Sequence, residues 1–220
     1  MLNIIKSSLN ANMRGISLVS NNIANSNTTA FKKSYSNFSD IYSKNIGDNP
    51  KGFSGMGVIN DSPRKQMFQG PLKQTNGALD LAVSGLGFLT LASENDTENR
   101  FYTRDGSLGL SSNGEVINQQ GLNLLAHPVV GDATYNPAIL EKVIIQPNIT
   151  DTLGNTRILT NVNVSPSGVL KAIYGLDEEV VIAKIPLTSF ESMEALQSEG
   201  NNLFTPTTKS GEPKVGIALE

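Results

Sequence analysis

The sequence holds few of the side chains that carry out acid–base or nucleophilic catalysis. Its 220 residues include one histidine, His127, and no cysteine. His127 precedes Pro128 in an expected loop, and its neighbours in sequence supply no Ser-His-Asp set and no metal-binding set. The absence of cysteine excludes thiol nucleophiles, thiolate metal sites and disulfides. We therefore expect no catalytic site, no metal site and no cofactor, and we interpret the protein as a non-enzyme.

Two other motifs approach the pattern of a ligand site without completing it. Glu94, Asp96 and Glu98 alternate as calcium ligands do, but an EF-hand loop needs its glycine and its terminal glutamate at set positions. The solvated tip of a hairpin is the better interpretation. The stretch GFSGMG at 52–57 lacks the G-x-G-x-x-G spacing, follows no strand and opens no helix, so we expect no nucleotide site.

Charge and hydropathy exclude two classes of partner. The net charge is −3 and the basic residues are scattered, so the sequence has no electrostatic footprint of a nucleic-acid-binding protein. No run of about 18 apolar residues is present to insert into a membrane. The N-terminus has no uninterrupted apolar stretch of the kind that signal peptides contain, so export would require another route.

The most regular pattern in the chain is an apolar stripe at its N-terminus. Over residues 2–25, apolar side chains recur at intervals of three and four, which predicts a long amphipathic helix. No core element is obvious beside it in the first 50 residues, so we expect this stripe to form an assembly interface with another subunit. The alternative is that the helix lies on the β-domain that follows. The stripe consists of Leu2, Ile5, Leu9, Met13, Ile16, Val19 and Ile23.

A cluster of asparagines follows the stripe directly, within SNNIANSNTTAFKKS at 20–34. Asparagine is a poor helix former, but its amide can cap carbonyl groups at a helix end and bridge to neighbouring backbone. We therefore expect a fixed polar junction here, with a solvated, frayed helix end as the alternative. The expected junction residues are Asn21, Asn22, Asn25, Asn27, Thr29 and Phe31.

The rest of the chain predicts a mainly β fold, a hairpin-rich β-domain of short strands behind the long helix. Apolar residues at 31–42 fall at helical spacing and suggest that the helix continues or a second one forms. We expect three segments: an N-terminal assembly helix and junction at 1–44, a Gly- and Pro-rich extended arm at 45–75, and the β-domain at 76–220.

Within the β-domain, alternation of Leu79, Leu81 and Val83 predicts a strand with one apolar face. Turn signals at 105–106, 113–114 and 121 predict hairpins, and LGLSSNGEVI and VNVSPSGVLKAI share a four-residue turn that ends in glycine. Thr188 and Glu191 have the spacing of a capping box, which predicts a short helix near 189–199.

Several blocks of the sequence resemble, in order, the bacterial flagellar rod and hook protein family. The segment 19–42 is similar to its N-terminal signature N-N-[IL]-A-N…T-x-G-F-[KR], with Ala30 at the usual glycine. GPLKQTNGALDLAVSGLGFLTL, YTRDGSLGLSSNGEVINQQGLNLLAHP and IPLTSFESMEALQSEGNNLFTPTTKSGEP resemble its later blocks. The matching signature residues are Asn21, Asn22, Ile23, Ala24, Asn25, Thr29, Phe31, Lys32, Phe38 and Asp40.

This resemblance implies a flagellar axial-protein-like fold and a structural subunit of the flagellar tube, exported by the type III route without a cleaved signal peptide. The implied partners are copies of itself, neighbouring rod, hook or junction proteins, and the export apparatus. The implied location is the basal body or hook, periplasmic to extracellular. In the family, the N-terminal helix pairs with a C-terminal helix that this sequence lacks, which suggests either a truncated or a divergent chain.

Three alternatives remain at the sequence level. The spacing between HPVV and IPLTSF leaves no room for a large outer domain and favours a distal or proximal rod protein, but a hook protein with a reduced outer domain fits almost as well. Exposed Asn, Thr and Tyr on hairpins would suit an adhesin-like or glycan-binding β module. A hydrolase would require His127 to lie in a pocket beside a carboxylate.

Overall fold

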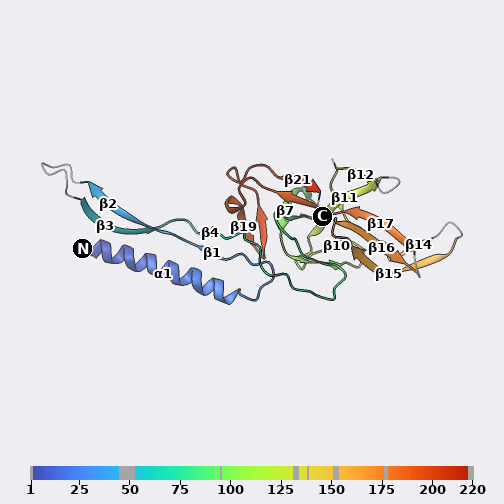
Figure 1. Cartoon of the computed structure of the whole chain (residues 1–220), viewed down its shortest axis with the longest axis horizontal. Coiled ribbons are helices and arrows are strands. Elements are labelled where there is room, and N and C mark those ends of the chain that lie inside the picture. Colours follow the sequence, from blue (N-terminus) through green and yellow to red (C-terminus); the bar gives the residue numbers. More distant parts are fainter. Residues whose placement is uncertain are drawn as a thin grey trace. The chain divides into compact units, whose positions relative to one another are not determined.

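The computed structural model describes residues 2–44, 53–94, 96–130, 134–137, 139–150, 154–175 and 178–217. Within these ranges the protein is mainly β with one N-terminal α-helix, which confirms the predicted fold class (Figure 1). The chain divides into two compact units, Met1–Phe68 and Gln69–Glu220. The finer division at 44 and 75 stays a prediction, and residues 45–52 of the expected arm lie outside the described ranges.

The first unit combines helix α1 (Leu2–Ala24) with an antiparallel pair, β2 (Phe38–Lys44) and β3 (Phe53–Asn60), along which it runs (Figure 1). A second short pair, β1 (Ser34–Tyr35) and β4 (Arg64–Lys65), continues toward the end of the unit. The prediction of a helix within 31–42 is wrong, because α1 ends at Ala24 and strand β2 begins at Phe38. Aromatic and β-branched residues favour strands, and here the partner β3 overrides the helical spacing.

The second unit is built of antiparallel strands around one large sheet. Its order is β14-β15-β16-β17-β11-β6-β7-β20-β19, and β18 pairs separately with β21 and β5 with β8. The longer strands are β6 (Leu89–Ser93), β7 (Asp96–Thr103), β11 (Asn123–Val130), β15 (Thr156–Val164), β16 (Val169–Tyr174), β17 (Glu178–Lys184), β18 (Pro186–Ser189), β19 (Gln197–Gly200) and β21 (Lys214–Ile217). The shorter strands are β5 (Asp80–Leu81), β8 (Gly106–Ser107), β9 (Gly109–Leu110), β10 (Val116–Ile117), β12 (Thr134–Tyr135), β13 (Glu141–Lys142), β14 (Asn148–Thr150) and β20 (Leu203–Thr205).

The hydrophobic core of the described residues lies in the second unit. Leu91, Leu124 and Ile145 are almost completely buried there. The alternating residues predicted to share a face do so, since Val83 is buried in this core and Leu79 and Leu81 pack against it. The second unit therefore has an apolar interior of its own, as expected for an independently stable domain.

Two of the predicted hairpin turns have the same backbone design. The amide of Gly114 donates to the Ser111 carbonyl, and the amide of Gly168 donates to the Ser165 carbonyl. Both glycines have a positive φ, 79° and 80°, which an L side chain rarely adopts. The turn at 105–106 is different: it leads into β8, which pairs with β5 rather than folding back on β7.

The helix predicted near 189–199 is reduced to one 3₁₀ turn, Met193–Ala195, between β18 and β19. Thr188 does not cap it, because the Thr188 hydroxyl lies 2.8 Å from that of Thr90 inside the core. Phe190 packs edge-on against Phe88 and Tyr102, with ring centroids 5.9 and 4.8 Å apart. Strand pairing and aromatic packing hold this segment in place, so the capping-box spacing does not lead to the predicted helix.

We predict that Gly106→Ala destabilises the second unit by about 1–3 kcal/mol. Gly106 is buried, and an added Cβ would collide with the backbone carbonyl of Leu81 on the paired strand. The measurement is the free energy of unfolding in urea. The matched control is Gly109→Ala, three residues away and exposed, where a Cβ would meet no atom. Equal loss of stability in both variants would contradict the prediction.

Candidate functional site

The predicted apolar stripe of α1 lies uncovered on the surface of the first unit. Each of its seven side chains is more than half exposed: Leu2 84%, Ile5 66%, Leu9 59%, Met13 60%, Ile16 66%, Val19 56% and Ile23 68%. We call these seven residues the ridge. Monomeric proteins rarely expose contiguous apolar surface of more than a few hundred Å². The ridge is therefore the strongest candidate for an interaction surface in the first unit.

The opposite side of α1 is the one that packs on the hairpin. Ala11 is buried, and the amide of Asn60 on β3 donates to its backbone carbonyl over 3.0 Å. A Cβ at Gly15 would lie 3.4 Å from the ring of Phe38, and one at Gly57 would clash with the Ser7 hydroxyl. Small residues on both elements thus allow close approach of helix and strand.

Sequence reasoning missed this small-residue face, although it has a signal. Ser7, Ala11 and Gly15 recur every four residues, so they line one side of a helix. At 3.6 residues per turn, their side of α1 is roughly 140° away from the middle of the ridge. Within its own unit the helix lies on a hairpin, and its large apolar residues stay outside that contact.

Asn22 connects the last turn of α1 to the start of β1 through two hydrogen bonds. Its Nδ2 donates to the carbonyl of Ser34 over 2.8 Å, and its Oδ1 accepts from the Ser34 amide over 2.9 Å. One side chain thus satisfies both backbone groups of the first residue of β1, as a neighbouring strand would. This pair joins the last turn of α1 to the returning chain.

The other junction residues contribute unequally. The Asn25 side chain donates to the Asn21 carbonyl at the helix end, and the Thr28 hydroxyl donates to the Asn25 side chain. Asn27 and Thr29 are exposed. Phe31 is partly buried, with the Lys65 ammonium 5.8 Å from its ring centroid, and partial burial lowers the pKa of Lys65.

Ala30, which stands where the resembled family has glycine, adopts a left-handed backbone. Its φ is 59°, in the region that costs a residue with a Cβ about 1–2 kcal/mol. The amide of the next residue, Phe31, donates to the Thr28 carbonyl and closes the turn. The chain reversal after α1 therefore requires a conformation that glycine would adopt without strain.

The candidate catalytic histidine has a structural role. His127 is 2% exposed on β11, and its Nδ1 lies 2.8 Å from the backbone carbonyl oxygen of Ile139. Because that oxygen can only accept, Nδ1 carries the proton and donates.

Of the alternating carboxylates, Asp96 accepts hydrogen bonds from the amide and the side chain of Asn99, at the β6–β7 hairpin. The Glu98 side chain lies outside the described parts.

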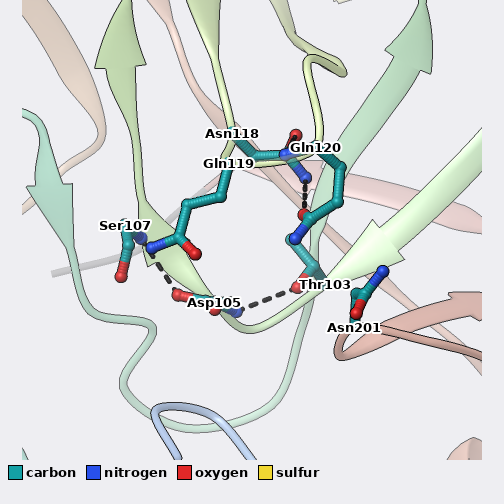
Figure 2. A pocket seen from close by; sticks show the side chains of 7 residues that line it. All are labelled: Thr103, Asp105, Ser107, Asn118, Gln119, Gln120 and Asn201. Atoms are coloured by element: carbon teal, nitrogen blue, oxygen red, sulfur yellow. Dashed lines mark hydrogen bonds between the residues drawn. The ribbon is translucent and has the colours of Figure 1, made fainter.

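A small polar pocket lies in the second unit, between the β7–β8 turn and the β10–β11 turn (Figure 2). The Thr103 hydroxyl accepts from the Asp105 amide, and the Asp105 carboxylate accepts from the Ser107 amide. The space holds about 10 Å³, enough for one water molecule. Its polar groups serve the turns themselves and leave no room for an organic substrate.

Neither a group of metal-ligating side chains nor a membrane-spanning helix is found among the described residues. They contain no group of three or more His, Asp or Glu side chains placed to hold a metal ion. The helix in the described ranges is not apolar enough over its length to cross a bilayer.

Comparison with known proteins points to one group. The family model described as "Flagellar hook protein FlgE/F/G D1 domain" matches residues 82–172. The chain is 29% identical to the flagellar basal-body rod protein FlgG of Buchnera aphidicola over 222 residues, 96% of this chain and 75% of that protein. It is 27% identical to FlgG of Caulobacter vibrioides over 236 residues, 97% of this chain and 79% of that protein.

A hook protein is similar over a shorter region. The chain is 34% identical to the flagellar hook protein FlgE of Caulobacter vibrioides over 166 residues, which are 72% of this chain and 28% of the hook protein. The chain thus spans about three quarters of the two rod proteins and less than a third of this hook protein.

We predict that Ala30→Gly stabilises the first unit by about 1 kcal/mol, because glycine relieves the left-handed strain. Thermal or urea unfolding followed by the far-ultraviolet circular dichroism of α1 measures the change. The control is Asn202→Gly in the second unit, where φ is 58°. Because asparagine tolerates this region, the same change there should relieve less strain. A helix that melts no later in Ala30→Gly than in the parent would contradict the prediction.

Proposed function

The chain belongs to the bacterial flagellar rod and hook protein family, and from that premise we propose that the ridge of α1 is the surface through which it assembles. Its role is that of a structural subunit of the flagellar axial tube. The observation that supports the ridge as interface is that all seven of its apolar side chains stay more than half exposed while the opposite helix face is packed.

The energy available from the ridge is of the right order for association. Burying one large apolar side chain contributes about 1.5–3 kcal/mol, so seven half- to mostly exposed ones offer on the order of 10 kcal/mol. Association itself costs roughly 4–15 kcal/mol in lost freedom of motion. The ridge alone therefore comes close to balancing that cost, and assembly needs additional contacts between copies.

Within the family, we infer a rod protein. Similarity to the rod proteins extends over 96–97% of this chain, whereas similarity to the hook protein covers 72%. The hook alternative is supported by the higher identity, 34%, over the shared region. We further infer a non-enzymatic protein that is exported by the flagellar type III route, located in the basal body or hook, and in contact with neighbouring axial proteins.

We predict that Ile16→Asp abolishes assembly of the full chain and leaves the second unit folded. Ile16 lies near the middle of the ridge, and an unpaired carboxylate buried in an interface costs several kcal/mol. Sedimentation over a concentration series measures assembly, and urea unfolding measures the second unit.

The matched control for Ile16→Asp is Asn10→Asp. It adds the same charge at an exposed position on α1 that belongs to neither the ridge nor the small-residue face. The control should assemble like the parent. Assembly of Ile16→Asp at parental concentrations would rule out the ridge as the interface.

A gene deletion in the bacterium of origin distinguishes rod from hook. If the protein is a rod subunit, isolated basal bodies should end in a shortened rod without a hook, because the tube grows outward and everything distal is lost. Electron microscopy of the basal bodies gives the result. A complete rod that lacks only the hook would identify the hook alternative, and intact flagella would contradict both.

A further inference from the structure

The sequence contains two Asn-Gly pairs, Asn76-Gly77 and Asn113-Gly114, and the structure holds them in opposite environments. An asparagine followed by glycine is especially prone to lose its side-chain amide, because glycine has no Cβ to keep its backbone nitrogen away from the asparagine side chain. The two pairs share this local chemistry. Whether each of them reacts therefore depends on how the fold holds its backbone.

Asn76 lies in a segment without helix or strand, between the end of β4 and the start of β5 at Asp80. Asn76 and Gly77 are both exposed. Among the described residues, none accepts a hydrogen bond from the Gly77 amide and none pairs with the Asn76 side chain. The Gly77 carbonyl accepts from the Asp80 amide over 3.2 Å, which leaves the nitrogen of Gly77 free.

Asn113 lies in the turn at 111–114, where the backbone is held on both sides of the reacting bond. The Gly114 amide donates to the Ser111 carbonyl over 3.0 Å, and the Gly114 carbonyl accepts from the Ile145 amide over 2.7 Å. The Asn113 amide donates to the Ser111 hydroxyl over 3.2 Å. Gly114 is also buried. Its nitrogen cannot attack while it is bonded to Ser111, so reaction here must wait for the turn to open.

We propose that Asn76 undergoes spontaneous deamidation in the folded protein and that the turn protects Asn113 from it. The nitrogen of Gly77, after its proton passes to the solvent, attacks the side-chain carbonyl carbon of Asn76. The new C–N bond closes a succinimide ring, and the bond to the side-chain nitrogen breaks, so that ammonia leaves. Water then opens the ring at either carbonyl and leaves aspartate or isoaspartate at position 76. The overall change consumes water, releases ammonia and needs no oxidant or cofactor.

The product changes the chain just ahead of β5. The carboxylate formed at position 76 adds a negative charge near that of Asp80, which lies against Gly77: a Cβ on Gly77 would be 2.5 Å from the Asp80 Oδ2. Like charges at close range repel. Isoaspartate also lengthens the main chain, within the segment that leads into the turn closed by the Asp80 amide. The modification therefore acts on the entry to β5, outside the buried core of the second unit.

Peptide mass spectrometry of the aged full-length protein tests the proposal. The folded protein is kept in mildly alkaline buffer, and the peptides that contain Asn76 and Asn113 are followed over time. We expect Asn76 to be converted at least about ten times faster than Asn113, because conversion at Asn113 requires the hydrogen bonds of its turn to open first. The product should be a mixture of aspartate and isoaspartate. Aspartate alone would exclude attack by Gly77 and overturn the proposed route.

Unfolding the chain in guanidinium chloride is the first control, and there both pairs should be converted at similar rates. The matched variant is Gly77→Ala, whose methyl group hinders the attack and would meet only the movable carboxylate of Asp80. It should slow conversion of Asn76 at least severalfold and leave the rate at Asn113 unchanged.

Equal rates at Asn76 and Asn113 in the folded protein would overturn the proposal. So would an Asn76 that stays intact in the folded protein over the time in which the unfolded chain is converted. The assay measures a reaction within one chain and needs no assembly. Its result is therefore independent of whether the ridge is the assembly surface.

Discussion

The contact between α1 and its hairpin determines which surfaces the first unit presents. An amphipathic helix normally buries its apolar side against the core. Here the helix is attached through Ser7, Ala11 and Gly15, whose small size allows it to lie close to the β2–β3 hairpin. The small residues and the large apolar residues lie on nearly opposite sides of α1. When the small residues face the hairpin, the large apolar ones therefore face away from it. The exposed ridge is thus a consequence of how the helix is attached.

The polar junction makes that arrangement specific. The residues of α1 shown at the hairpin contact are small, so their packing alone does little to determine the rotation of α1 about its axis. The two hydrogen bonds between Asn22 and the backbone of Ser34 fix the helix rotation at one end, and the bond from Asn60 to Ala11 fixes it nearer the middle. Hydrogen bonds are directional where apolar contact is not. The asparagines therefore determine the direction in which the ridge points.

The sequence predicted the parts of this design that depend on local spacing. The N-terminal helix, its apolar stripe and the glycine-ending turns at 111–114 and 165–168 all follow from patterns within about 25 residues. It failed where distant pairing decides: Phe38 and Ile41 fit a helix as well as a strand until β3 is known. The hydrogen bond from Asn60 to the Ala11 carbonyl, which holds α1 on the hairpin, joins residues 49 apart in sequence. Hydrophobic periodicity detects only the apolar face of a helix. Likewise, Thr188 has the local spacing of a cap, but its hydroxyl pairs with Thr90 across the core.

The two units differ in what stabilises them, and this difference bears on assembly. The second unit encloses a core of its own, so its stability does not depend on other copies. Among its described residues, the first unit has Ala11 and Met67 as its buried hydrophobic side chains. α1 is rich in Asn and Ser, which are weak helix formers. A partner that binds only the folded form raises its free energy of unfolding, by an amount that grows with the logarithm of the partner's concentration. On the proposed assembly through the ridge, ordering of the first unit and growth of the polymer are coupled, because covering the ridge of a copy stabilises the helix that carries it.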